Sequence, residues 1–122
     1  MINVESYREY CLSKPGVTEG CPFGPDTLVF KVMEKMFALC SINTFEFINL
    51  KCDPERAIEL REQHDAIRPG YHMNKQHWNS VYVDGTLSDQ LIFELIDHSY
   101  DLVADSLTKK LKEELLVLKN NA

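Results

Sequence analysis

Residues 28–51 read LVFKVMEKMFALCSINTFEFINLK, and this stretch decides the fold. Apolar runs rich in β-branched and aromatic side chains lie at 28–33, 36–42 and 45–51. Such runs, bounded by polar residues, are typical of β-strands. Only the short polar links Glu34-Lys35 and Asn43-Thr44 separate them. Because links this short join antiparallel neighbours, we expect a three-stranded meander with a central second strand.

Helices are expected before and after this meander in the sequence. Asn3, Asp53 and Ser88 each precede an apolar pattern of helical period, as capping residues do. They predict helices over residues 4–14, from Pro54 to about His64, and from Asp89 to about Leu107, with a last helix carrying Leu111, Leu115 and Leu118. Residues 78–83 predict a fourth strand, and the Gly- and Pro-rich residues 17–26 predict a loop or a short irregular edge strand.

These elements predict an α+β fold in a single domain, residues 1–122. We expect two layers, in which strands 28–33, 36–42, 45–51 and 78–83 form one antiparallel sheet and the helices pack on one face. The chain lacks an apolar run of 18 residues, and Met1–Glu5 do not resemble a signal peptide. We therefore expect a cytoplasmic protein with no membrane partner. The four cysteines show neither zinc-site nor C-x-x-C spacing, so we expect no metal and no disulfide framework.

Residues 68–78, RPGYHMNKQHW, concentrate the side chains that can do chemistry. The stretch has neither helical nor strand period, which predicts a long loop, and long loops in small domains are often functional. It contains two of the four His residues and the only Trp. The candidate ligand- or nucleic-acid-binding residues are Arg68, His72, Asn74, Lys75, His77 and Trp78.

Several interpretations of this loop stay open. Arg68, Lys75 and the two His residues can hold a phosphate or carboxylate, while Trp78 and Tyr71 can stack on a ring or base. His72 or His77 can act as a general acid or base, although no nucleophile or paired carboxylate accompanies them. A metal site would need His64 or Asp65 as a third ligand. The structural alternative is that Arg68 and Asn74 bond the loop backbone and that Trp78 is a core residue.

The chain resembles the MmcQ/YjbR family of small bacterial cytoplasmic proteins. The resemblance rests on Arg68-Pro69, His72, Asn74-Lys75, His77-Trp78, Val81 and Asp84-Gly85, and on Pro22-Phe23-Gly24, Phe30-Lys31-Val32 and Asn49–Glu55, in the same order. It implies a fold like that of the frataxin homologue CyaY. It also implies DNA binding through a "double wing" of hairpins. The resemblance implies no catalytic residues for this chain.

Our leading hypothesis is therefore a non-enzymatic DNA-binding module that needs no cofactor and exists as a monomer or weak dimer. The alternative is a protein that binds a small molecule or anion, with or without catalysis, at loop 68–78. A third is a domain that binds a partner at an exposed hairpin edge. The net charge of −6 disfavours nucleic-acid binding. A continuous basic strip joining Lys31, Lys35, Lys51 and the loop would favour DNA, whereas isolated basic residues around a pocket would favour a small ligand.

Overall fold

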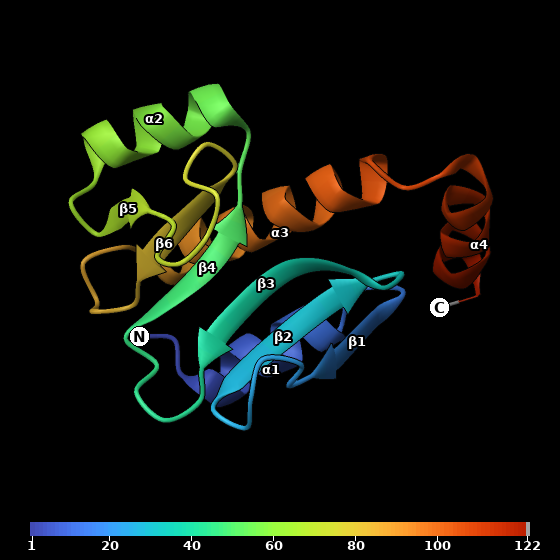
Figure 1. Cartoon of the computed structure of the whole chain (residues 1–122), viewed down its shortest axis with the longest axis horizontal. Coiled ribbons are helices and arrows are strands. Elements are labelled where there is room, and N and C mark those ends of the chain that lie inside the picture. The colour runs from blue at the N-terminus through green and yellow to red at the C-terminus, as the bar shows by residue number, and fades with distance from the viewer. Residues whose placement is uncertain (122) are drawn as a thin grey trace.

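One antiparallel sheet runs through the protein in the strand order β1-β2-β3-β4-β6-β5 (Figure 1). The structure, a computed structural model, describes residues 1–121. Its strands are β1 (Val17–Gly20), β2 (Thr27–Val32), β3 (Lys35–Ser41), β4 (Phe47–Lys51), β5 (Ile67–Pro69) and β6 (Trp78–Tyr82). Its helices are α1 (Val4–Leu12), α2 (Pro54–Gln63), α3 (Asp89–Asp105) and α4 (Lys109–Asn120).

Helices α1, α2 and α3 cover one face of this sheet, whereas α4 lies beyond the end of α3 (Figure 1) and contributes Leu115 to the core. In Figure 1, α1 and α3 lie behind the strands, and α2 contributes Ala57 and Leu60 to the same core as Leu50 and Val81. The expected two-layer α+β architecture is confirmed. The caps also act as expected, because the side chains of Asn3, Asp53 and Ser88 each accept a hydrogen bond from a backbone N–H in the first turn of their helix. Helices α1, α2 and α3 end up to two residues earlier than predicted.

The predicted meander forms the centre of the sheet. β2 pairs with β3 and β3 with β4, and β6 pairs with β4 from Phe47–Tyr82 to Lys51–Trp78. The first turn is placed one residue earlier than expected. Met33 and Glu34 both have positive φ, 47° and 73°, which gives the tight turn that hairpins favour, and Lys35 already belongs to β3.

Two edge strands extend the expected four-stranded sheet. Residues 17–20 pair with β2, so the edge-strand interpretation of 17–26 is correct for the first part of that stretch. Arg68 and Pro69 pair with β6 as part of β5, so the loop is shorter than predicted and begins at Gly70. Phe45 has a φ of 42° and lies outside β4, because its ring turns into the core, 5.6 Å from the ring of Tyr7.

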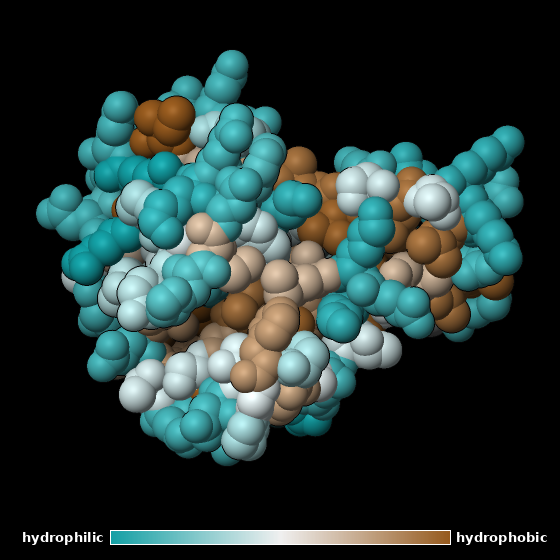
Figure 2. Space-filling model, in the orientation of Figure 1, coloured by the Kyte–Doolittle hydropathy of each residue, from teal (hydrophilic) through white to brown (hydrophobic). Residues whose placement is uncertain are grey.

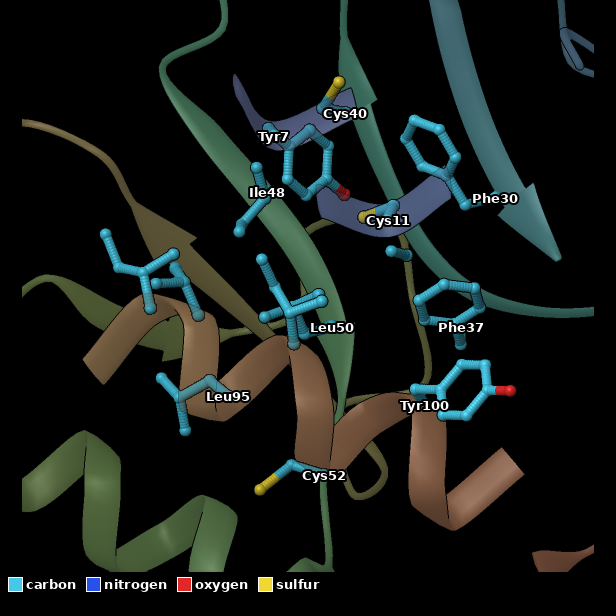
Figure 3. Close-up of a cluster of buried hydrophobic side chains, with 14 of the residues drawn as sticks. Tyr7, Cys11, Phe30, Phe37, Cys40, Ile48, Leu50, Cys52, Leu95 and Tyr100 are labelled. Carbon is cyan, nitrogen blue, oxygen red and sulfur yellow. The ribbon is translucent and has the colours of Figure 1, made fainter. Parts of the chain in front are cut away.

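The main core lies between the sheet and its helices (Figure 3). Tyr7 from α1 meets Phe30 edge to face at 5.4 Å, and Phe37 from β3 meets Tyr100 from α3 in the same way at 5.5 Å. Edge-to-face pairs of this kind are favourable beyond their burial. Phe37 can reach this core because the pairing of β2 with β3 skips it, so that Phe30 faces Ala38 and Lys31 faces Met36.

Candidate functional site

The sheet face opposite the helices, which we call the open face, carries the candidate site. Val29, Leu39 and Trp78 form a small buried cluster there, with Met36 and Met73 packed against it. The loop formed by residues 70–77 crosses this face in front of β4 and β6 (Figure 1). Trp78 is therefore buried as expected, at 8% exposure, but in this second cluster instead of the core under the helices.

A cavity of about 380 Å³ opens beside this cluster, and we call it the open-face cavity. Phe23, Phe47 and Tyr71 give it three aromatic rings. Met36, Met73 and Leu39 add aliphatic surface, and Asn49 and His72 are among its few polar residues. No Asp, Glu, Lys or Arg of the described chain lines it. Figure 2 shows this side of the molecule, where brown and tan surface lines a hollow surrounded by hydrophilic teal.

A network of three hydrogen bonds lies beneath the cavity, and two of them fasten the loop to the sheet. Ser80 Oγ donates to Asn49 Oδ1 at 2.5 Å, and the backbone N–H of Tyr71 donates to Ser80 Oγ at 2.9 Å. Asn49 Nδ2 then donates to the carbonyl of Tyr71 at 3.2 Å. Asn49 and Ser80 are buried, so these bonds satisfy polar groups that water does not reach. The network fixes Tyr71 as one side of the cavity.

Arg61 of α2 holds the other end of the same loop. Its Nε donates to Asn79 Oδ1 at 2.6 Å, and its Nη2 donates to the carbonyl oxygens of Lys75 and, at 3.3 Å, Trp78. The planar guanidinium suits this task because it presents several donors in fixed directions. Sequence reasoning missed Arg61, as it missed Asn49. The signal for Asn49 was present, since Asn is unusual in the middle of a strand.

Asn74 and Lys75 bond the loop itself. Asn74 Oδ1 accepts from the backbone N–H groups of Gln76 and His77 at 2.9 and 3.3 Å, which is a turn stabilised by a side chain. Lys75 Nζ donates to the carbonyl of Gly70 at 3.1 Å. These bonds match the structural alternative considered for the loop.

Arg68 and His72 point to different places. Arg68 stacks over Tyr82 at 4.4 Å, donates to the carbonyl of Asp65 at 3.2 Å, and lines a separate polar cavity of about 300 Å³ with His64. His72 lines the open-face cavity, where its ring lies 4.1 Å from that of Tyr71. The φ of His72 is 58°, a left-handed conformation that is uncommon for residues other than Gly.

His72 is thus the one candidate of the six that lines the open-face cavity. His77 is partly buried, and its carbonyl accepts from the backbone N–H of Cys52 at 2.8 Å. Within residues 1–121, no three His, Cys, Asp or Glu side chains are grouped so that they could hold a metal ion. Over the same residues, no helix has the length and apolar character needed to cross a membrane. Burial raises the pKa of the Cys40 thiol to about 12, which makes it a poor nucleophile.

Known proteins resemble the chain over nearly its whole length. The Escherichia coli O157:H7 protein named "Uncharacterized protein YbdF" is 42% identical over 107 residues, covering 87% of this chain and 88% of its own. "Uncharacterized protein YjbR" of Escherichia coli K12 is 35% identical over 117 residues, covering 95% and 98%.

Solved structures support the same relationship. The crystal structure of Deinococcus radiodurans protein DR2400, with domain DUF419, matches with a TM-score of 0.88 and 43% identity, covering 94% of this chain and 88% of that one. A Pseudomonas syringae protein matches with a TM-score of 0.72 and 31% identity, covering 84% and 99%. The sequence model of the YjbR family matches residues 12–102. The chain belongs to the YjbR family.

Proposed function

We propose that this protein binds a small, largely apolar molecule in the open-face cavity. The observation that carries the proposal is the cavity itself, about 380 Å³ of mainly apolar and aromatic surface. Small-molecule sites are mostly concave and apolar, measure about 300–1,000 Å³, and contain a few placed polar groups. Asn49 and His72 supply such groups here.

The surroundings of the cavity favour a neutral ligand over a small anion. Arg68 lines a different cavity, and Lys75 bonds the carbonyl of Gly70. Among residues 1–121, His72 is therefore the only basic side chain that lines the cavity. The hydrogen bonds of Asn49 and Arg61 hold the loop in place before any ligand arrives, which lowers the entropy cost of binding.

A thermal-shift screen with metabolites tests this proposal, because a ligand that binds only the folded state raises its stability. Each hit is repeated with Ser41→Phe, which adds a ring inside the cavity, and with Thr18→Phe, which adds one to an exposed strand residue outside it. The shift should disappear in Ser41→Phe and persist in Thr18→Phe. Hits that stabilise both variants equally would place binding elsewhere and contradict the proposal.

DNA binding is the second candidate, and the sheet register favours it. Lys31 pairs with Met36 and Lys51 with Trp78, so both lysines share the open face with the loop that carries Lys75. If hairpins of this sheet act as DNA-binding wings, the open face would be the surface that contacts the phosphates. The net charge of −6 makes this binding weak and sensitive to salt.

Salt titrations of short DNA distinguish this candidate. Lys75→Ala and Arg68→Ala should each reduce the slope of log affinity against log salt by about 1, because each removes about one phosphate contact. Lys112→Ala on the exposed side of α4 is the matched control and should leave the slope unchanged. An absence of binding to duplex and single-stranded DNA at low salt would refute DNA binding.

A further inference from the structure

Three aromatic side chains from distant parts of the chain meet at the open-face cavity. Phe23 comes from the connection between β1 and β2, Phe47 from β4, and Tyr71 from the loop. Phe23 is 66% exposed and Tyr71 is 58% exposed. Single exposed apolar residues are common, but two large rings flanking one cavity form a surface that a ligand can cover.

The walls of the cavity suit a flat ring better than a flexible chain. The rings of Phe47 and Tyr71 lie 5.9 Å apart at 84°, an edge-to-face arrangement that a further ring can extend. The thioethers of Met36 and Met73 also line the cavity, and sulfur makes favourable contacts with aromatic edges. An aliphatic ligand would gain only from burial of apolar surface, whereas an aromatic ligand would gain from that burial and from contacts with the rings and sulfur atoms.

Asn49 adds a directed polar contact at the base of the cavity. Its side-chain amide has two N–H donors, and the hydrogen bonds among the described residues use one of them, toward the carbonyl of Tyr71. Asn49 is 6% exposed and lines the cavity. A ligand with an acceptor on its buried edge would pair with the remaining donor, and the lack of charged lining residues favours an uncharged buried portion.

We propose that the ligand is a flat aromatic or heteroaromatic ring of one or two fused rings, which carries a hydrogen-bond acceptor on its edge. The ring packs against Phe23, Phe47 and Tyr71 and directs its acceptor toward Asn49. This inference rests on the proposed function, because it specifies which class of small molecule the open-face cavity takes.

Methionine methyl NMR tests the inference on the intact chain. Of the four methionines, Met36 and Met73 line the cavity, whereas Met1 and Met33 do not and serve as internal references. Benzimidazole and adenine are the aromatic probes, and cyclohexylmethanol is the aliphatic probe of similar size. We expect saturable upfield or downfield ring-current shifts at Met36 and Met73 with the aromatic probes, with Met1 and Met33 unchanged.

Phe23 provides the matched variants, since its exposure means that replacement should leave the fold intact. Phe23→Leu keeps an apolar side chain without a ring and should weaken binding of the aromatic probes by roughly twofold to tenfold, as expected for one aromatic pair. Phe23→Tyr keeps the ring and should bind as the wild type does. Equal affinities for the Leu and Tyr variants would overturn the inference.

The probes separate the two proposals. Binding of cyclohexylmethanol in the cavity at least as tight as that of both aromatic probes would overturn the ring inference and leave the proposed function standing. Failure of all three probes to shift Met36 and Met73 at millimolar concentration would overturn both. Selective binding of the aromatic probes, weakened in Phe23→Leu, would support both.

Discussion

Replacing Arg61 by Ala should destabilise the protein more than replacing Arg68, although Arg68 is the arginine that the sequence singles out. Arg61 makes two short hydrogen bonds, to Asn79 Oδ1 and to the carbonyl of Lys75, and one longer bond to the carbonyl of Trp78. A bond to a charged donor contributes about 1.5–3 kcal/mol net. The third bond adds little at 3.3 Å, and partial exposure of Arg61 reduces the total. We expect a loss of about 2–4 kcal/mol from the free energy of unfolding.

Urea unfolding of Arg61→Ala, Arg61→Lys and Arg68→Ala measures this difference. Arg61→Lys should recover part of the loss, because one ammonium can reach only some of the acceptors that the guanidinium fork serves. Arg68 stacks on Tyr82 at the exposed edge of the sheet, so Arg68→Ala should cost less than about 1 kcal/mol. A loss below about 1 kcal/mol for Arg61→Ala, or a larger loss for Arg68→Ala, would refute the role given to Arg61.

Two further predictions concern the helix-covered side. The hydroxyl of Tyr7 is buried without an oxygen or nitrogen partner among the described residues, while that of Tyr100 donates to the carbonyl of Pro15 at 2.6 Å. In thermal unfolding, Tyr7→Phe should therefore be neutral or stabilising by up to about 1 kcal/mol. Tyr100→Phe should be destabilising by about 1 kcal/mol, and the opposite order of the two variants would contradict the roles given to these hydroxyls. Burial, then the charge of Arg56, lowers the pKa of His98 below 6.5, and its neutral Nε2 accepts from the backbone N–H of Asp53 at 3.2 Å. The unfolded chain therefore binds a proton at His98 more tightly than the folded protein does. The contribution of neutral His98 to the free energy of unfolding is complete above about pH 6.5 and is lost as the pH falls through the lowered pKa. Urea midpoints measured against pH should show that drop, and a drop of equal size in His98→Gln would refute the assignment to this residue.

Local patterns predicted the elements of the fold well, because each depends on neighbours in sequence. The alternation in 28–51 and its two polar links determined the meander, and the capping residues determined where α1, α2 and α3 begin. The strand β5 could not be predicted in this way. It has only three residues, includes Pro69, and exists because β6 offers it a partner.

The site was harder to predict, because it depends on which strands become neighbours. Asn49 meets Ser80 only because β4 pairs with β6, and no spacing within either strand indicates that pairing. Long-range partners also matter on α3, where Glu94, Asp97, Asp101 and Asp105 form an acidic stripe at helical spacing. Such a stripe by itself indicates a solvated face. Asp97, one member of that stripe, accepts hydrogen bonds from Tyr10, at 2.7 Å, and from Lys14.

The order of strands has a consequence for how the protein folds. β2, β3 and β4 are joined by short turns and can pair early, whereas β6 reaches β4 only after the chain closes the long loop between Lys51 and Trp78. Closing such loops costs entropy and slows folding. The open-face cavity takes Phe47 from the early part and Tyr71 from the segment that arrives with β6. A partly folded chain with only the meander would lack Tyr71, His72 and Met73 from the cavity lining, so a ligand should slow unfolding without accelerating the first steps of folding.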